Sequence, residues 1–557
     1  MRKTTIFILF FSLLIGQATM AWSQPAAVKR AAKSVFSVTT FKDDGSIHGS
    51  GYGVFTGKAG EGIAMWNLFD GAKRAVVVDA QGRSHEVDVI LGVSELYDIC
   101  QFRVKNINNA GLPTITTDVP ATSAYLVGYD IKKAPIKLIK PEKVEKFMTS
   151  NNYYIFKDID ISNTDLGNPI VNVNGQLMGI MQRHKNGGQA FVTDVRIINT
   201  FKTNGLSLND RSMQATGIRP ALPTDEQQAM LMLMMAAQQG DSARYEAYIT
   251  DFINLFPTSH VGYQTRATRL IQQRELAKAD DILMLSLKNA AQKDQAYCDY
   301  AQAMFRAVAF KTDTTYTQWS FSRAIQLAQK AYEINPQPIY RHLQAQILYA
   351  EGDYQKALDI YSALQKTPLG KNGEVYYEAA QCKMALNAPK TEIISLLDSA
   401  ATIAKGPAAA PYVLARGRYY DNAGEYRKAF ADYLTYDTLV NYRGTHDFYY
   451  TKFKCEMKLR QYQLALNDIA HAIVLNRTEP TYYAEMGNLQ LQVNKLEDAV
   501  RTCDMGLAIA QEYTDLYIIK GIALCEQSKR MEGLKALQKA HELGDSRAQK
   551  LIDKYTK

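Results

Sequence analysis

The stretch TDLGNPIVNVNGQLMG, residues 164–179, decides how the first part of this chain folds. It holds a Gly-Asn-Pro turn and two short apolar runs, with an Asn-Gly pair between the runs. An Asn-Gly pair in that setting is the strongest short-range signal of a β-hairpin. Similar runs of β-branched and aromatic residues, separated by Gly, Asn and Asp, recur from residue 26 to residue 201. Many short strands with turn signals between them predict an all-β sandwich or barrel.

The length and composition exclude several classes of protein. A chain of 557 residues is too long for one hydrophobic core, so we expect two or more domains. Apolar residues make up 46% and charged residues 22%, which is ordinary for soluble globular protein. The formal net charge of +8 is modest, and no basic block or basic-aromatic motif indicates a nucleic-acid partner.

The cysteines and histidines give no sign of a cofactor. Six cysteines are spread through the chain without a CxxC pair, so we expect buried thiols rather than a disulfide framework. The eight histidines include no pair at metal-ligand spacing. The sequence therefore predicts no metal and no cofactor.

Residues 1–23 have the features of a secretory signal peptide. Arg2 and Lys3 form a charged start, and an apolar segment follows from Ile6 to Ile15. This segment is too short to cross a bilayer comfortably, and small residues offer cleavage near Ala21 or after Ser23. No later segment is apolar enough to span a membrane, so we expect an exported protein without an integral span.

The second part of the chain, residues 226–557, repeats at helical spacing. Five segments, EGDYQKALDIY, AGEYRKAFADY, LRQYQLALNDI, VNKLEDAVRTC and SKRMEGLKALQ, share one pattern. After the second of them the steps are 36, 34 and 35 residues, and the 72-residue step before it leaves room for a weaker unit around KTEIISLLDSAATIA. Small residues at fixed offsets would let two helices approach closely. Each segment carries an aromatic or apolar residue at one shared position: Tyr354, Tyr426, Tyr462, Leu496 and Met531. The small residues are Ala357, Ala429, Ala465 and Ala499, with Gly417, Gly487 and Gly521.

This period resembles that of the tetratricopeptide repeat family. The resemblance implies a superhelix of stacked helix pairs whose concave wall holds a protein or peptide partner. By repeat position, Arg418, Asn422, Lys454 and Asn488 would point into that wall, although an ordinary solvated helix residue is the alternative for each one. The polar segment before the repeats, residues 206–225, contains two prolines and is expected to be a linker.

The first part resembles a second family. GSGYGVFTGKAGEGIAMWNLFDGAKRAVVVDAQGR, residues 49–83, and DICQFRV, residues 98–104, are similar to trypsin-like serine peptidases of the bacterial HtrA-like branch. AYLVGY from Ala124 and QAFVTDV from Gln189 match later strands of that family. The resemblance implies two packed antiparallel β-barrels over residues 26–205. The expected fold class is therefore multidomain, with an all-β double barrel followed by an all-α solenoid.

The resemblance also assigns the catalytic positions. In that family a Ser attacks the substrate carbonyl, a His takes its proton, and an Asp orients the His. Aligned on the Asp-Gly-Ala turn at residues 70–72, the His position falls on Asn67 and the Asp position on Asp98. Asp98 has two readings: a relic that orients Asn67 through a hydrogen bond, or an acceptor for backbone N–H groups at the barrel junction.

The nucleophile position follows from the Gly-x-Pro motif at residues 167–169. It falls on Leu166, and Thr164 replaces the glycine whose N–H helps form the oxyanion hole. A hydrocarbon cannot attack a carbonyl, and an amide cannot accept a proton near neutral pH. Placing Ser162 at the nucleophile position breaks the Gly-x-Pro match. We expect His48 and His85, the nearest histidines, to be surface imidazoles.

These residues predict an exported, non-catalytic pseudoprotease or scaffold that binds protein or peptide partners through its helical repeats. The vestigial protease cleft is a second candidate binding site, through addition of a strand. One alternative is a serine-type endopeptidase homologue with weak or rebuilt hydrolytic activity, and another is a structural solenoid with a β-domain cap. The chain ends in repeat helices without a β-rich sorting domain, so we expect the periplasm rather than the cell surface. The oligomeric state is left open.

Overall fold

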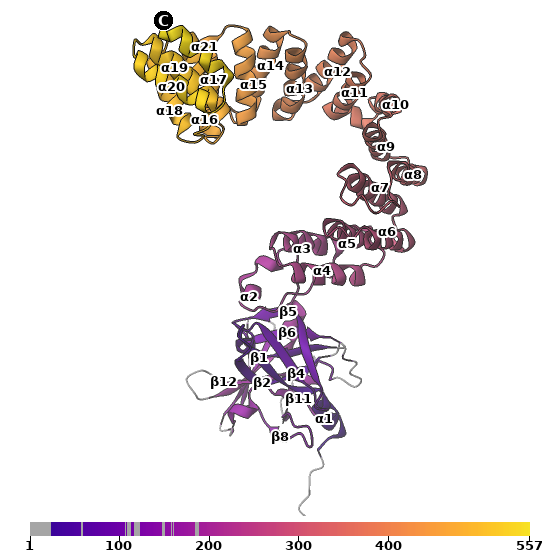
Figure 1. Ribbon diagram of the computed structural model, residues 1–557. Helices are drawn as coiled ribbons and strands as arrows, with labels where there is room; N and C mark the ends of the chain where they lie inside the picture. Colours follow the sequence, from indigo (N-terminus) through magenta and orange to yellow (C-terminus); the bar gives the residue numbers. More distant parts are fainter. Residues whose placement is uncertain are drawn as a thin grey trace, which may run out of the picture. The chain divides into compact units, whose positions relative to one another are not determined.

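The computed structural model describes residues 24–557 except 57–59, 106, 108–112, 116–122, 148–150, 158, 160 and 184–188. The expected signal peptide, residues 1–23, lies outside the described residues. The chain divides into two compact units: Met1–Arg266 with Asn289–Ala291, and Ala267–Lys288 with Gln292–Lys557. Figure 1 shows that the strands belong to the first of these units and that most of the helices follow them in sequence.

The first sheet is a closed antiparallel barrel in the order β1-β2-β3-β6-β5-β4. Its interior is filled by aromatic side chains, among which Phe36 lies against Phe55 and Phe102 with ring centroids 4.7 and 5.7 Å apart. Closure leaves this sheet without an edge strand. The strands are β1 (Val35–Phe41), β2 (Ile47–Phe55), β3 (Glu61–Ala64), β4 (Arg74–Val78), β5 (Ser84–Ser94) and β6 (Ile99–Val104).

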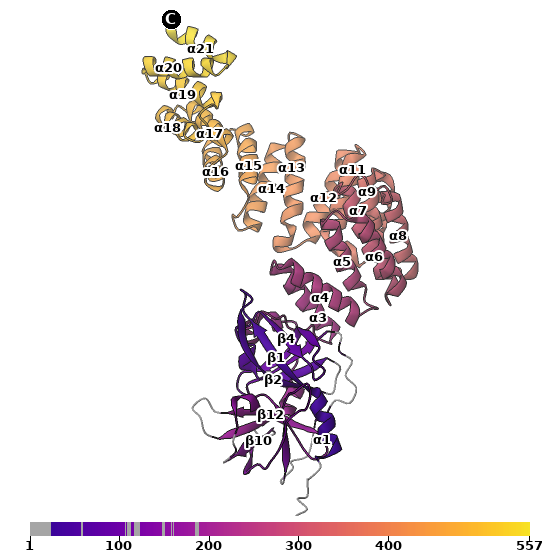
Figure 2. The same ribbon diagram turned by 60° about the horizontal axis from the view of Figure 1, so that its bottom comes forward.

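The second sheet has seven strands in the order β8-β7-β11-β12-β13-β10-β9. Its two edge strands are consecutive in the chain and are joined by only residues 140–142, so the sheet must curl until its edges approach. Figure 2 shows β10 and β12 of this sheet below β1, β2 and β4 of the first. The strands are β7 (Ala124–Val127), β8 (Ile136–Ile139), β9 (Lys143–Phe147), β10 (Asn151–Phe156), β11 (Pro169–Val171), β12 (Leu177–Arg183) and β13 (Ala190–Asp194).

The hairpin expected within residues 164–179 is confirmed. Strands β11 and β12 pair antiparallel, with Val171 opposite Leu177. Between them the Asn172 side-chain oxygen accepts the N–H groups of Asn174 and Gln176 at 3.0 and 2.9 Å. Such bonds from an Asn side chain to the backbone of its own turn stabilise the reversal of the chain.

The segment expected to be a linker, residues 206–225, is packed against the first barrel. It contains a short helix, α2 (Arg211–Gln214), and it exchanges backbone hydrogen bonds with Ile90 of β5 through Arg219 and Ala221, at 3.0 and 2.8 Å. The Arg219 side chain is 8% exposed and pairs with Asp88 of β5 and with Asp251 of helix α4 (Ser242–Leu255). The segment therefore fastens α4 to the barrel within the first unit.

The rest of the chain forms successive antiparallel helix pairs. In α3–α4 and in the pairs from α7–α8 to α19–α20, the two helices pack against each other, as repeat proteins require. The helices are α3 (Glu226–Gln238), α4, α5 (His260–Gln272), α6 (Leu276–Asn289), α7 (Lys293–Ala309), α8 (Phe321–Ile334), α9 (Pro338–Glu351), α10 (Tyr354–Leu364), α11 (Gly373–Ala385), α12 (Lys390–Ile403), α13 (Ala410–Asn422), α14 (Tyr426–Leu439), α15 (His446–Lys458), α16 (Tyr462–Leu475), α17 (Pro480–Gln492), α18 (Leu496–Leu507), α19 (Thr514–Glu526), α20 (Arg530–Glu542) and α21 (Ser546–Thr556).

The repeated residues lie where two helices come closest. The alanines at the shared offset, Ala357, Ala429, Ala465 and Ala499, are each 0% exposed. A Cβ added to Gly521 would lie 2.6 Å from the Leu537 side chain of the following helix, which is too close for any larger residue. Helix α12 occupies the interval in which a weaker unit was expected. The close helix contacts predicted from these small residues are confirmed.

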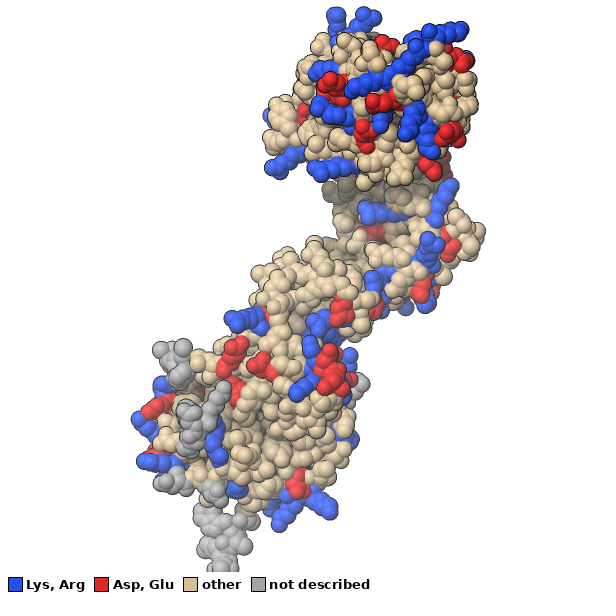
Figure 3. All heavy atoms as spheres, turned by 60° about the vertical axis from the view of Figure 1, so that its left-hand side comes forward, with Lys and Arg blue, Asp and Glu red and all other residues tan. Residues whose placement is uncertain are grey.

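The fold class expected from the sequence is confirmed. Two barrel-like β-sheets stand in series, as the resemblance to trypsin-like peptidases implied, and an all-α region follows. All six cysteines are free, and burial raises the pKa of the Cys100 thiol. No helix among the described residues is both long and apolar enough for a bilayer span. On the face drawn in Figure 3, basic and acidic side chains are interspersed, in keeping with the formal net charge of +8.

Candidate functional site

Asn67 and Asp98, assigned to the His and Asp positions, are in contact. Asn67 lies in a 3-10 turn (Trp66–Leu68) that follows β3, and Asp98 lies in the turn between β5 and β6. The Asp98 carboxylate accepts the backbone N–H of Asn67 at 2.7 Å, and the Asp98 carbonyl accepts the N–H of Trp66 at 3.2 Å. The sequence left two roles open for Asp98, and this contact corresponds to one of them, the acceptor of a backbone N–H group. The Asn67 side chain itself is exposed.

Gln182 of β12 fastens this turn to the second sheet. The Gln182 side chain is 2% exposed, and its Nε2 donates to the carbonyls of Tyr97 and Asp98 at 2.9 and 3.1 Å. Its Oε1 accepts the Thr193 hydroxyl at 2.9 Å, so both ends of the amide are used. Sequence reasoning missed this residue, although a Gln within the apolar run LMGIMQR was a signal that a buried polar contact existed.

Leu166, at the nucleophile position, is half-buried and packs against the apolar core of the second sheet. Gly167 beside it has φ +79°, and a Cβ there would lie 2.6 Å from the Tyr52 carbonyl of β2. The Gly167 N–H donates to the Met181 carbonyl of β12 at 2.8 Å. The loop that carries Leu166 and the turn that carries Asp98 are therefore bonded to consecutive residues of β12, Met181 and Gln182.

Thr164, at the oxyanion position, lies in the middle of a 3-10 turn (Asn163–Asp165). Its hydroxyl is 2.7 Å from that of Ser162, and its carbonyl accepts the Asn168 side-chain amide at 2.8 Å. The Asp165 N–H donates to the Ser162 carbonyl at 3.0 Å, which closes the turn on itself. Ser162 is thus engaged in capping this turn, and its hydroxyl also donates to the Asp165 carboxylate at 2.7 Å.

An ion pair between buried Asp165 and exposed Lys137 contacts the same turn. Asp165 is 8% exposed, and Lys137 of β8 approaches its two carboxylate oxygens at 3.0 and 2.9 Å. Burial opposes the charged form, but the hydrogen bonds from Lys137 and Ser162 outweigh it and lower the pKa of Asp165. The turn is therefore stabilised as a rigid, charged unit near neutral pH.

The two described histidines of this part of the chain serve the backbone and a turn. His48 Nε2 lies 2.8 Å from the carbonyl of Asp70. His85 was expected to be a surface imidazole, which is wrong, because its side chain is only 13% exposed and pairs with Asp79 at 3.1 Å. His184 lies outside the described residues.

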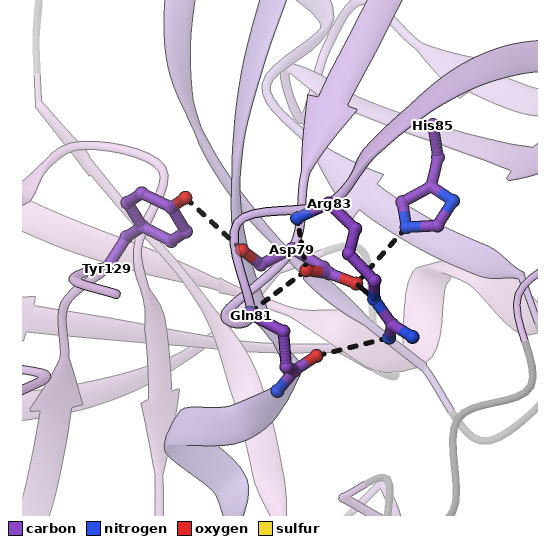
Figure 4. Close-up of polar contacts among 5 residues, drawn as sticks. All are labelled: Asp79, Gln81, Arg83, His85 and Tyr129. Carbon is purple, nitrogen blue, oxygen red and sulfur yellow. Dashed lines mark hydrogen bonds and ion pairs between the residues drawn. The ribbon is translucent and has the colours of Figure 1, made fainter. Parts of the chain in front are cut away.

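Figure 4 shows the cluster around Asp79, which is 1% exposed at the turn between β4 and β5. Its carboxylate accepts the N–H groups of Gln81 and Arg83, the Arg83 guanidinium and the His85 ring, all at 2.8–3.1 Å. Tyr129, which follows β7 of the second sheet, donates to the Asp79 carbonyl at 3.2 Å. The Asp79 and His85 pair therefore stabilises a turn, and the Tyr129 hydroxyl joins that turn to the second sheet.

The four predicted groove residues are exposed on first helices of their pairs: Arg418 and Asn422 on α13, Lys454 on α15 and Asn488 on α17. Two tyrosines that the sequence did not single out lie among them. Lys454 Nζ is 4.7 Å from the ring of Tyr450, which in turn lies 5.0 Å from the ring of Tyr482. Lys454 therefore lies over a partly buried Tyr450, whereas Tyr482 is only 4% exposed and belongs to the core beneath.

The comparisons with known proteins cover about a third of this chain, 31–32% of it. No protein-family model matches the chain, and a search of curated proteins also found no match. The HtrA-type protease AlgW with a tripeptide matches at 18% identity over 31% of this chain and 60% of its own, with a TM-score of 0.27. An M. tuberculosis protease in its active form matches at 12% identity, over 32% and 86%, with a TM-score of 0.28. A serine endoprotease from Yersinia pestis matches at 20% identity, over 31% and 63%, with a TM-score of 0.27. The chain thus spans less than two thirds of two of these proteins, and such scores do not identify a function.

Proposed function

We propose that the mature chain is an exported, non-catalytic pseudoprotease that binds protein or peptide partners through its helical region. The observation that carries the proposal is the packing of Leu166 against the core of the second sheet, at the position that the sequence resemblance assigns to the nucleophile. Asn67 at the base position adds to it, because its contact with Asp98 runs through the backbone. In a well-studied triad, loss of the nucleophile or base alone lowers turnover by about a millionfold.

The binding role is supported by the exposed surface of α13, α15 and α17. Arg418, Lys454 and Asn488 present cationic and amide groups, and the partly exposed Tyr450 lies beside Lys454. Tyr and Arg side chains are enriched among the residues that dominate protein interfaces. We propose that these helices form the concave wall of a tetratricopeptide-type superhelix. The proposed location of the protein is the periplasm.

Partner capture with matched charge reversals tests the binding role. The groove variant carries Arg418→Glu and Lys454→Glu, and the control carries Arg427→Glu and Lys535→Glu, which are exposed on the second helices α14 and α20. Each mature protein is immobilised, exposed to the envelope extract of the producing cell, and the bound proteins are quantified by mass spectrometry. We expect the amount of the main partner captured by the groove variant to fall at least about tenfold, because hot-spot residues contribute most of the binding energy of an interface. The control should capture as much as the wild type.

Two results would contradict the proposal. Equal capture by the groove variant and the control would mean that this surface does not bind the partner. Capture that is lost on deletion of residues 26–205, and unaffected by the groove variant, would transfer the binding role to the β part.

A further inference from the structure

Three potential metal ligands meet on two neighbouring helices of the second unit. His342 of α9 and Glu374 and Glu378 of α11 each offer one ligand atom, and these three atoms all lie within 4.8 Å of one another. His342 and Glu378 are 36 residues apart, which is one repeat of the helix pairs, so the solenoid itself sets them side by side. Glu374 and Glu378 are separated by one helical turn and share a face of α11.

The cluster is pre-organised by contacts outside it. His342 is 7% exposed, its ring packs edge-on against Tyr361, and its Nε2 lies 2.5 Å from a Glu378 oxygen. The other Glu378 oxygen accepts the Gln346 side-chain amide at 2.9 Å, which orients the carboxylate toward His342. Hydrogen bonds of this kind to a ligating carboxylate are typical of metal sites.

The charges around His342 favour a cation. Glu378 contacts the His342 ring, and the ligand atom of Glu374 lies within 4.8 Å of both, so two carboxylates face the same point. Glu374 is exposed and leaves one side of the cluster open to solvent. Two carboxylates and one buried imidazole therefore surround a position that attracts positive charge and can be reached from outside.

We propose that His342, Glu374 and Glu378 bind one divalent transition-metal ion of the Zn²⁺ type. A nitrogen ligand with two carboxylates suits Zn²⁺, whereas Mg²⁺ and Ca²⁺ prefer oxygen ligands alone. Three protein ligands leave a fourth position for water.

The ligand atoms need only small movements. At Zn–N and Zn–O bonds of about 2.0–2.2 Å, two ligands of one tetrahedral ion lie about 3.4 Å apart. The His342 and Glu378 atoms must separate slightly, and Glu374 must approach by a change of rotamer, which its exposed side chain permits. The proposal does not depend on the binding role of the helical region.

Metal titration of the tag-free, metal-stripped mature chain tests the site. Isothermal titration with Zn²⁺ alone should show one ion per chain, and Mg²⁺ or Ca²⁺ at the same concentration should give no binding. We expect His342→Gln to abolish this binding and Glu374→Gln to weaken it at least about tenfold. His446→Gln is the matched control. His446 also contacts a residue 36 positions later, Tyr482, on a helix of the next pair. This variant should leave Zn²⁺ binding unchanged.

Folding and ligand identity are checked separately. Glu374 is exposed, so the Glu374→Gln variant should retain the wild-type circular dichroism spectrum even if His342→Gln does not. X-ray absorption at the zinc edge should report nitrogen and oxygen neighbours only. The proposal is overturned if the wild type binds Zn²⁺ no more tightly than Glu374→Gln, or if a sulfur neighbour appears, which would assign the ion to a cysteine.

Discussion

The Asp98 carboxylate accepts a backbone N–H, and this contact needs no imidazole. Asp98 has φ +48°, a left-handed conformation that Asp and Asn adopt more readily than most residues. Its carboxylate and its carbonyl together bind the turn of Asn67 and the side chain of Gln182. The carboxylate therefore has a structural role in this turn that does not depend on catalysis.

Replacement of Asp98 tests that structural role. Asp98→Ala removes the acceptor for the Asn67 N–H and places a residue less suited to positive φ, so we expect a loss of about 2–4 kcal/mol in unfolding free energy. Asp98→Asn keeps an acceptor oxygen and the backbone preference, and should cost less than half as much. Urea denaturation followed by Trp66 fluorescence, with Trp22 and Trp319 replaced by Phe, measures both. Equal losses in the two variants would contradict the role assigned to the backbone contact.

The ion pair of Lys137 and Asp165 predicts a pH dependence. Because the folded-state pKa of Asp165 is lowered from 3.8, its contribution to stability is present above that value and is lost as the pH falls through the lower folded-state pKa. Because the Lys137 side chain is half exposed, Lys137→Met should destabilise the first unit by only about 0.2–1 kcal/mol at neutral pH, and the difference from wild type should shrink below pH 3.8. Exposed Lys146→Met on β9 is the matched control. A difference that is constant with pH would exclude the ion pair as its cause.

The position of a single site residue could be predicted from the sequence where a short motif lies next to it. Leu166 and Thr164 follow from the Gly-x-Pro motif beside them, and Asn67 from the Asp-Gly-Ala turn. Gln182 and Lys137 could not be found in this way, because they contact the site from strands 84 and 28 residues away. The sequence near a turn does not indicate which distant strand will contact that turn in the folded protein.

Helices α14, α15 and α16 share a buried cluster of charge. Lys452 of α15 lies between Asp437 of α14 and Asp468 of α16, at 3.2 and 3.1 Å, and its side chain is 8% exposed. Glu456, one turn further along α15, is 1% exposed and lies beside Asp468. Burial, together with the hydrogen bond and negative charge of Asp468, raises the pKa of Glu456.

This cluster predicts a stability loss at high pH. A carboxyl group whose folded-state pKa is raised from 4.5 to about 9 contributes fully below 4.5, and its contribution is lost as the pH rises between these values. Glu456→Gln should therefore be more stable than the wild type at neutral pH, and its advantage should grow as the pH rises above 4.5. Far-UV circular dichroism in urea at several pH values measures the difference. Exposed Glu497→Gln of α18 should show none, and a Glu456→Gln difference that did not grow with pH would contradict the assignment.

Helices and strands could be predicted from the sequence where a turn motif or a repeated pattern marked them. The Asn-Gly hairpin and the second helices that begin at Tyr354, Tyr426, Tyr462 and Leu496 lie where the pattern placed them. The packing of residues 206–225 on the barrel was not visible, because its polar composition and two prolines resemble those of a linker. The backbone bonds to Ile90 that hold it depend on a partner more than 100 residues earlier in the chain.

At the scale of the whole molecule, a β unit is joined to a long helical region in one chain. In the β unit, the sequence resemblance assigns a hydrocarbon, Leu166, and an amide, Asn67, to the nucleophile and base positions. The helical region has exposed cationic side chains, among them Arg418 and Lys454. We expect the first unit to support or position the second, and not to cleave what it binds.

Labelling with a fluorophosphonate probe tests the absence of serine hydrolysis most directly. The purified mature wild type should take up no probe, because a covalent adduct requires a hydroxyl activated by a base. Asn67→His with Leu166→Ser is the matched variant, and we expect weak labelling at most, since Thr164 still closes its 3-10 turn at the oxyanion position. Stoichiometric labelling of the wild type, lost when one serine is replaced by alanine, would contradict the account.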